Sequence, residues 1–266
     1  MHRLTLFSLC VILMLMRSTT YGQSIWLSRP EKGSIDIEFL RPNFKNENAT
    51  KLTNSSMFIT GRFVSSRITV VAELPVARGD VAGGGSETAV GNPYVGLEFY
   101  NPDGPWMFEV GGRIPVMSED KTAAQVVGMH ADFDRFEAFL SDVVTLTSKL
   151  GYFRKNDANM LLRLRAGPTF FAETKGDKET DWFLDYLGQV GYDGPQLYLL
   201  AGVSGRYFLS AETGSFEERS VHQAVGSLGF KFGSVQPGVH VKLPLDEDLK
   251  ESLDAVIGVN VGFVLK

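Results

Sequence analysis

The alternation that decides the fold is clearest in residues 254–265, which read DAVIGVNVGFVL. Every second residue from Ala255 onward is apolar, whereas the residues between them include Gly258 and Asn260. Successive side chains of a β-strand point to opposite faces of the sheet. The stretch therefore predicts a strand with one apolar face and one small or polar face.

The same pattern returns along the chain. In residues 35–39 the apolar side chains alternate with Asp36 and Glu38, and in residues 67–74 with Arg67, Thr69, Val71 and Glu73. In residues 160–166 they alternate with Leu161, Arg163 and Arg165. We predict about twelve strands from such stretches. They lie near 34–41, 56–64, 66–77, 93–100, 105–116, 143–154, 159–172, 182–192, 195–210, 220–232, 236–244 and 254–265.

The connections between these strands alternate in length. Tight turns such as 64–67, 101–104, 155–158 and 192–195 take turns with longer polar loops. The loops lie near 42–55, 78–92, 117–142, 173–181, 211–219 and 245–253. A membrane β-barrel returns by short turns on the periplasmic side and by longer loops outside. The chain is thus predicted to be all-β, a closed antiparallel transmembrane barrel with both ends periplasmic. Pro168 falls inside a predicted strand and requires a bulge or a strand end there.

The first 22 residues have the composition of a secretory signal. A short basic start precedes a mostly apolar run from Leu4 to Met16, and Thr20-Tyr21-Gly22 places small residues before a cut at Gln23. Arg17 leaves an uncleaved anchor as the alternative. The predicted domains are a signal peptide, 1–22, and an outer-membrane barrel, 23–266, which contains no cysteine because Cys10 is the only one.

Charge and hydropathy exclude two other classes. Loss of Arg3 and Arg17, with no acid in the same segment, takes the formal charge from −5 to −7. Such an acidic chain has no electrostatic footprint for nucleic acid. No later stretch approaches the 18 uninterrupted apolar residues of a membrane helix, which argues against a helical bundle.

Residues 123–144 are the one segment with a different period. Val126, Met129, Phe133, Phe136, Leu140 and Val143 recur at spacings of three and four, which is typical of a helix. We expect a loop helix that folds over or into the outer mouth. It can cap the rim, contact a solute or gate the channel; the alternative is an additional pair of strands.

The bilayer assigns the two faces of the strands. Hydrocarbon offers no hydrogen-bond partner to the backbone, so the strands must close into a ring with their apolar faces toward lipid. Aromatic residues near strand ends are expected to form interfacial girdles. They are Phe99, Tyr100, Trp106, Tyr152, Phe153, Phe170, Phe171, Trp182, Tyr192, Tyr207 and Phe208.

The opposite faces supply the candidate lumen. Besides Asp36, it comprises Glu38, Arg62, Glu73, Glu98, Glu109, Arg113, Arg163, Arg165 and Lys242. Mixed charges across a narrow lumen either pair structurally, since a broken buried pair leaves an uncompensated charge, or form the wall of a pore for a small polar solute. Catalysis by these carboxylates is the third reading.

Other chemical sites are not indicated. His130, His222 and His240 lack the spacing of a zinc motif, and each reads as a surface or core histidine. The Gly83-Gly84-Gly85 run is not followed by Lys-Ser/Thr and does not predict a phosphate loop. We expect no catalytic residue, no metal and no cofactor.

Several stretches resemble uncharacterised outer-membrane β-barrels of Gram-negative bacteria. They are Gly61-Arg62-Phe63, Glu73-Leu74-Pro75, residues 91–98 and residues 244–265. The Asn-Pro-Tyr-x-Gly-Leu run of residues 92–97 is similar to one in barrels often labelled transporters of aromatic-degradation pathways. The resemblance implies location and fold, not a substrate. The chain ends on Leu265-Lys266, whereas such barrels commonly end on an aromatic residue that the insertion machinery reads.

The sequence leaves two functions open for this barrel of the outer membrane. One is a channel or transporter for small solutes, and the other is a non-conducting structural or adhesive envelope protein. Twelve strands lie between small barrels filled by side chains and large porins, so size does not decide. A secreted soluble β-sandwich, with the apolar faces inside, is a third reading. The expected partners are outer-membrane lipid, the barrel-insertion machinery and a small solute.

Overall fold

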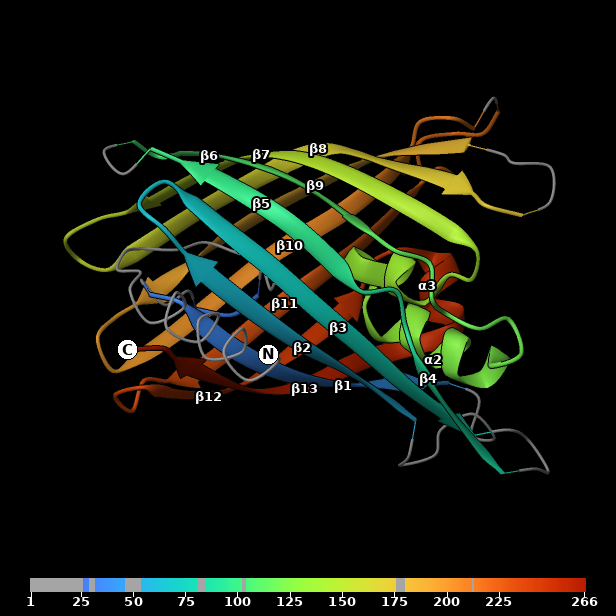
Figure 1. Cartoon of the computed structure of the whole chain (residues 1–266), viewed down its shortest axis with the longest axis horizontal. Coiled ribbons are helices and arrows are strands. Elements are labelled where there is room, and N and C mark those ends of the chain that lie inside the picture. Colours follow the sequence, from blue (N-terminus) through green and yellow to red (C-terminus); the bar gives the residue numbers. More distant parts are fainter. Residues whose placement is uncertain are drawn as a thin grey trace, which may run out of the picture.

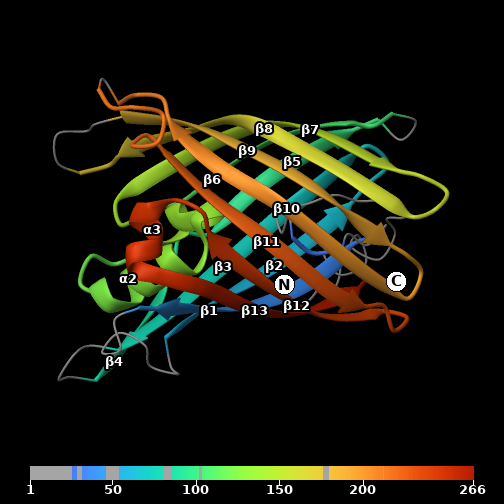
Figure 2. The same cartoon turned by 180° about the vertical axis from the view of Figure 1, so that it is seen from behind.

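The strands form one antiparallel sheet that closes on itself. The computed structural model describes residues 26–28, 32–45, 54–80, 85–101, 104–175, 180–211 and 213–266. β1 (Ser34–Phe44) pairs with β13 (Leu253–Val264) on one side and with β2 (Ser55–Val64) on the other, and β2 pairs with β3 (Ile68–Asp80). These pairings complete a ring, seen from two sides in Figures 1 and 2.

The remaining strands follow one another around the barrel in chain order. They are β4 (Ser86–Val90), β5 (Tyr94–Tyr100), β6 (Trp106–Arg113), β7 (Val143–Lys155), β8 (Met160–Glu173), β9 (Thr180–Asp193), β10 (Leu197–Phe208), β11 (Ser220–Phe230) and β12 (Val235–Pro244). Both β4 and β5 pair with β3, so they are two halves of one barrel strand, interrupted at residues 91–93. The barrel therefore has twelve strands, as predicted. The predicted loop 78–92 is wrong, because β3 runs on to Asp80 and β4 extends the hairpin.

The connections are sorted by length between the two ends of the barrel. One end carries the turns that follow β2, β5, β7, β9 and β11, and the other carries α2 (Thr122–Ala131), the 3-10 helix η1 (Phe133–Phe139) and α3 (Glu247–Ser252) (Figure 1). Short turns mark the periplasmic end of such barrels, so the helices lie at the outer end. The short helix α3 was not predicted. Among the described residues, no helix is long and apolar enough to cross a membrane.

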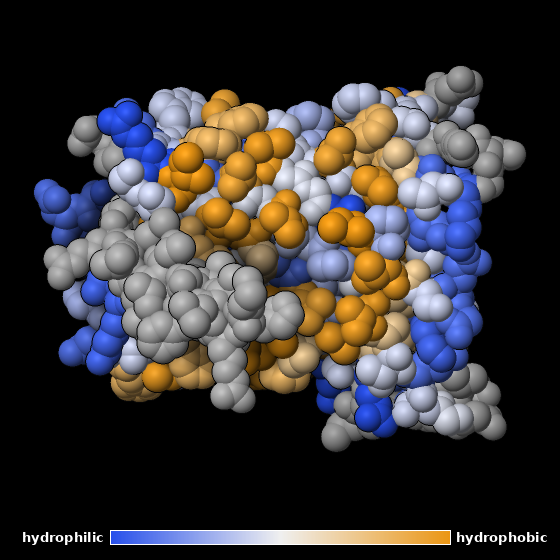
Figure 3. Space-filling model, in the orientation of Figure 1, coloured by the Kyte–Doolittle hydropathy of each residue, from blue (hydrophilic) through white to orange (hydrophobic). Residues whose placement is uncertain are grey.

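The two strand faces are those that the alternation predicts. On β13, Ile257 is 53% and Val259 is 49% exposed, whereas Asn260 is 8% exposed and faces inward. The outward apolar side chains form a hydrophobic surface between more hydrophilic ends (Figure 3). This is the reverse of a soluble β-sandwich, which places its apolar faces inside.

Two local predictions are corrected. Pro168 introduces neither a bulge nor a strand end, because it lies within β8 and still pairs with β9. The β7–β8 ladder is interrupted next to Pro168, but its register is the same on both sides of the interruption. The aromatic girdle is also smaller than predicted. Tyr100, Phe153, Phe171 and Phe208 occupy inward positions of their strands, because they follow or precede the lipid-facing residues by one position.

Candidate functional site: a closed lumen and its outer plug

The segment after β6 turns into the barrel and fills its outer mouth. We call residues 122–140, which contain α2 and η1, the outer plug. Its helical character confirms the prediction for residues 123–144, although the helices end at Phe139 and the alternative of an extra strand pair is wrong. The two helices are separated at Asp132, whose backbone is extended and whose Oδ1 accepts a hydrogen bond of 3.1 Å from the Asp134 amide.

Apolar packing fixes the plug to one wall of the barrel. A buried cluster joins the plug to the inner faces of β1, β2, β3 and β13; its members include Leu40, Phe58, Ala77, Ala124, Val127, Phe139 and Val256. Gly79 of β3 permits the close approach, since a Cβ there would lie 2.2 Å from the Ala123 carbonyl oxygen. The plug is thus packed as tightly as a protein core on this side.

Arg135 of the plug is the centre of a buried ion-pair network. Its Nη1 donates to Glu73 Oε2 at 2.8 Å, its Nε donates to Asp132 Oδ2 at 2.7 Å, and its Nη2 donates to Glu38. The guanidinium also lies 3.7 Å from the centroid of the Phe58 ring. One plug cation therefore neutralises carboxylates on β1, β3 and the plug itself.

Further pairs extend the network across the lumen. Arg113 Nη2 donates to Glu73 Oε1 at 2.7 Å, and Lys242 Nζ lies 2.8 Å from Asp132 Oδ2. His240 Nε2 lies 3.0 Å from Glu38 Oε1. Breaking one member of such a network would leave an uncompensated charge in a buried place.

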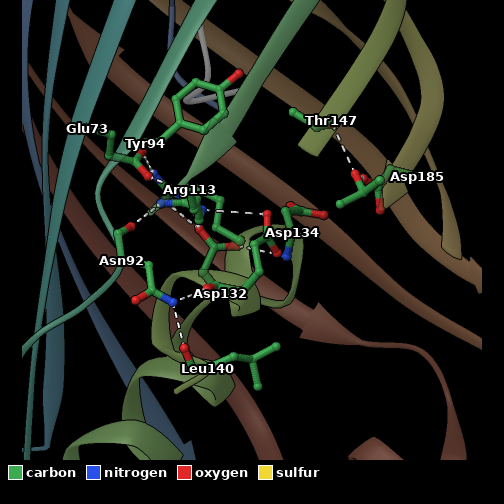
Figure 4. Close-up of polar contacts among 12 residues, drawn as sticks. Glu73, Asn92, Tyr94, Arg113, Asp132, Asp134, Leu140, Thr147 and Asp185 are labelled. Carbon is green, nitrogen blue, oxygen red and sulfur yellow. Dashed lines mark hydrogen bonds and ion pairs between the residues drawn. The ribbon is translucent and has the colours of Figure 1, made fainter. Parts of the chain in front are cut away.

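Asn92 straps the end of the plug to the interrupted barrel strand (Figure 4). Its Nδ2 donates to the carbonyl oxygens of Glu137, at 3.0 Å, and Leu140, at 2.6 Å. Its Oδ1 accepts from the amides of Val116, at 2.8 Å, and Met117, at 3.0 Å. This one buried amide therefore holds both the segment before the plug and the end of the plug, which explains the break between β4 and β5.

A second cluster closes the opposite wall, on β7, β9 and β10. Asp185 lies 2.9 Å from Lys149 Nζ and 2.9 Å from Arg206 Nε. Arg206 Nη2 lies 2.9 Å from Glu137 Oε2 and donates to the Asp134 carbonyl at 2.7 Å. The plug is thus tied to the wall on both sides.

The structure places all nine predicted lumen residues inside the barrel, each at most 5% exposed. Glu38, Glu73, Arg113 and Lys242 belong to the network around the plug. Arg62 pairs with Asp36 at 2.6 Å, and Arg165 pairs with Glu109, which accepts from Tyr94. Glu98 lies near Tyr94 and Arg165, and Arg163 lies 5.7 Å from the Phe153 ring centroid.

Sequence reasoning missed several residues of this site. Lys149, Asp185 and Arg206 lie on the inward side of the same alternation, so the pattern could have found them. Arg135 and Asp132 lie in a loop segment, where the alternation has no meaning.

The segment before β1 was also missed. Residues 26–28 lie inside the barrel, with Trp26 and Leu27 both 2% exposed. Trp26 Nε1 donates to Asp134 Oδ2 at 2.8 Å, and Ser28 Oγ donates to Asp193 Oδ1 at 2.7 Å. No periodicity marks this segment, because it forms neither strand nor helix.

Two cavities are lined by described residues of the lumen. A cavity of about 290 Å³ lies at the outer mouth beside the plug. A deeper one, lined by Asp134, Arg165 and Asp185, holds only about 20 Å³, which is room for about one water molecule. Arg206 lines both cavities. At this level of the described structure, the plug and the ion pairs of Arg206 therefore occupy the lumen.

The plug carboxylates differ in their proton affinity. Burial alone would raise the pKa of Asp132, but the positive charges of Arg135 and Lys242 outweigh burial and hold the pKa below its ordinary value. Burial and the neighbouring charge of Asp132 raise the pKa of Asp134. These shifts favour the charged form of Asp132 and the protonated form of Asp134.

The described histidines lie apart from one another. No group of three or more His, Cys, Asp or Glu side chains within the described ranges is arranged to hold a metal ion. His240 is buried against Glu38, as a core histidine. At the outer rim, His222 Nδ1 lies 2.9 Å from Asp246 Oδ1, and its Nε2 lies 2.6 Å from the Tyr186 hydroxyl.

Comparison with known proteins defines the class through the fold. No family model matches the chain, and no curated protein matches its sequence. The COG4313 outer membrane channel from Pseudomonas putida F1 is similar with a TM-score of 0.62 and 11% identity, over 92% of this chain and 100% of that one.

Two further solved structures share the architecture. The NanC porin has a TM-score of 0.54 and 9% identity, over 87% of this chain and 100% of its own. LpxR from Salmonella typhimurium, an enzyme, has a TM-score of 0.52 and 9% identity with the same coverage. The chain therefore has the fold of outer-membrane β-barrels, a fold that channels and at least one enzyme share.

Proposed function

We propose that this protein is an outer-membrane channel or transporter for small solutes, seen here with its lumen closed. The observation that carries the proposal is the placement of charge. A mixed-sign polar wall runs along the inside of a twelve-strand barrel, and a separate segment, the outer plug, occupies the mouth. A wall of this kind suits the passage of a polar solute once the plug moves.

Closure of the lumen depends on noncovalent contacts of the plug, which can break and form again. The plug is held by the guanidinium groups of Arg135 and Arg206, by the Asn92 amide and by one apolar cluster. Arg206 and Asp185 form the constriction below the mouth. Opening requires that the plug leaves the lumen or that this pair separates.

Planar-bilayer conductance tests the proposal. Refolded wild-type protein should conduct rarely, whereas a variant in which a short Gly-Ser linker replaces residues 119–141 should conduct continuously. A second variant, with Arg163 and Arg165 both changed to Ser in the linker background, should shift selectivity toward cations because two positive charges are lost. No current from the correctly folded linker variant would instead support a structural or adhesive envelope barrel.

We propose no catalytic role for the barrel. The Tyr186–His222–Asp246 chain places a phenol, not an aliphatic hydroxyl, on the imidazole. Glu38, Glu73 and Glu109 of the lumen are engaged in ion pairs, which serve the structural need for charge compensation.

Export and membrane insertion belong to the same proposal. The signal segment 1–22 and its cleavage near Gln23 lie outside the described residues. We expect the mature protein to begin near Gln23, to use the barrel-insertion machinery and to contact outer-membrane lipid through its apolar faces. Mass spectrometry of the native protein, combined with membrane fractionation, tests both expectations; a soluble periplasmic product would contradict them.

A further inference from the structure

The cavity at the outer mouth differs in chemistry from the rest of the lumen. It measures about 290 Å³ and lies between the plug and the wall of β9, β10 and β11. Its lining is mainly apolar, and the apolar side chains are Met129, Phe133, Phe136, Phe183, Phe208 and Val221. The deeper cavity is lined by charged side chains such as Asp134, Arg165 and Asp185, so an apolar cavity beside it calls for a physical reason.

The cavity wall is aromatic and firmly held. The rings of Phe183 and Phe208 are stacked with centroids 4.8 Å apart, and Phe136 meets Phe183 edge to face at 6.1 Å. The Arg206 guanidinium lies 4.6 Å from the centroid of the Phe136 ring. Flat rings fixed in this way offer surfaces against which another ring can stack. The size lies at the lower end of the range for small-molecule pockets.

Arg206 supplies one unused polar group. The residue is 6% exposed, and its Nε and Nη2 lie within ion-pair distance of Asp185 and Glu137. Its Nη1 is buried and has no hydrogen-bond partner among the described residues. A buried donor without a partner is costly, so an acceptor oxygen that reaches Nη1 as a ligand packs against the Arg206 side chain would relieve that cost.

The surrounding charges determine the kind of acceptor. Arg206 and Lys149 are balanced by Asp185 and Glu137. At the rim, Arg219 donates to the carbonyl oxygens of Phe208 and Leu209, and Glu218 also lines the cavity. The formal charges of these six groups sum to zero, so the site offers no net positive charge to an anion. The best complement is therefore a neutral carbonyl oxygen.

From this combination we infer that the outer mouth is a binding site for a neutral, compact ring compound that carries a carbonyl oxygen. The ring packs between the phenylalanines of the plug and those of β9 and β10, and the oxygen accepts from Arg206 Nη1. The site would be the first contact of a solute with the proposed channel, but binding itself does not depend on transport.

Fluorine NMR with 4-fluoroacetophenone tests the site in detergent-solubilised, full-length mature protein. Saturable binding is expected for the wild type. Val221→Trp, which fills the cavity, should weaken binding at least about tenfold, whereas Val239→Trp, on the lipid face, should leave it unchanged. Comparison of the two variants corrects for partition of the probe into the micelle. Heat-modifiable gel mobility reports whether both variants are folded.

A second probe tests the hydrogen bond. 1-Ethyl-4-fluorobenzene has a similar shape but no acceptor, and it should bind about tenfold more weakly, as expected for one unsatisfied buried donor. Equal binding of both probes, equal binding by Val221→Trp and wild type, or no saturable binding would each overturn the inference. Because binding is measured at equilibrium, a positive result stands even if the barrel conducts no current.

Discussion

The indole Nε1 of Trp26 donates a hydrogen bond of 2.8 Å to Oδ2 of Asp134, which joins the segment before the first strand to the outer plug. The two residues are 108 positions apart in the chain. Gln223 Nε2 on β11 also donates to Asp134 Oδ2, at 2.6 Å. Two segments that lie inside the barrel therefore meet at one carboxylate, and movement of either weakens the hold on the other.

Trp26→Phe should make the closed state less stable. The substitution keeps an aromatic ring in the cluster with Leu187 and Val225 but removes the N–H donor. Loss of a hydrogen bond to a buried polar group costs about 1–3 kcal/mol, so we expect openings in planar bilayers to become about tenfold more frequent. Trp182→Phe, at a lipid-exposed position, is the control. Unchanged conductance in Trp26→Phe would show that residues 26–28 do not take part in closure.

Arg135→Met should undock the plug. It leaves Glu38, Glu73 and Asp132 without their shared cation, and breaking a buried pair costs about 3–5 kcal/mol. We expect faster chymotrypsin cleavage at the phenylalanines of η1 and a cation-selective current.

The control lies directly before the plug. Lys121 pairs with Asp120 at 3.6 Å on the surface, where such pairs contribute at most about 1 kcal/mol, so Lys121→Met should behave as wild type. Equal protease resistance of Arg135→Met and wild type would mean that apolar packing alone holds the plug.

Asn92 should be needed to hold the plug against the wall. Asn92→Asp keeps the acceptor for the Val116 and Met117 amides but loses both donors to the plug carbonyls, and Asn92→Ala loses all four hydrogen bonds. Each buried group left without a partner costs about 1–3 kcal/mol. We expect plug protection in hydrogen exchange to fall in both variants, and further in Ala. Loss of protection only in the barrel strands would place the role of Asn92 in the sheet instead.

The barrel was predictable from the sequence because its signal is local. Alternation places Val259 toward lipid and Asn260 inward, and the loop lengths determine which end is outer. The plug was predictable only as a helix, since its position depends on Arg135 finding partners on β1 and β3, far away in the chain. Periodicity carries no information on such pairing.

Glycine shows a second limit of sequence reasoning. Gly258 lies on the inward face, where serine would seem harmless by alternation alone. In the structure, however, a Cβ on Gly258 would lie 2.1 Å from His240 Nε2. The small residue makes room for a buried histidine, and this requirement is invisible without the fold. Gly258→Ser should therefore destabilise the barrel by about 1–3 kcal/mol through overpacking.

Val259→Arg should impair folding more than Asn260→Ser. Arginine on the lipid face near the midplane costs about 2–4 kcal/mol in barrels of this kind, whereas serine at an inward polar position keeps a small polar side chain. Heat-modifiable gel mobility after refolding measures the folded fraction directly. Equal tolerance of the two substitutions would show that the lipid-facing register is wrong.

Acid should open the channel through Asp132. The pKa of Asp132 in the closed plug lies below its ordinary value of 3.8, because Arg135 and Lys242 outweigh burial. The closed plug therefore binds this proton less well than the released plug does. Its contribution to closure is fully present above the ordinary pKa and is lost as pH falls through the lower, closed-state pKa.

Protonation of the neighbouring carboxyl, that of Asp134, has the opposite effect on closure. Burial and the charge of Asp132 raise the pKa of Asp134, so protonation of Asp134 favours closure, and this contribution is lost as pH rises through the raised pKa. Current should thus fall slightly as the solution is first acidified and rise below about pH 4, the ordinary range of an aspartate. Asp134→Asn should remove the initial fall, and Asp132→Asn should conduct already at neutral pH with a flatter acid limb. If the pH profile of Asp132→Asn superimposes on that of the wild type, Asp132 does not control the opening.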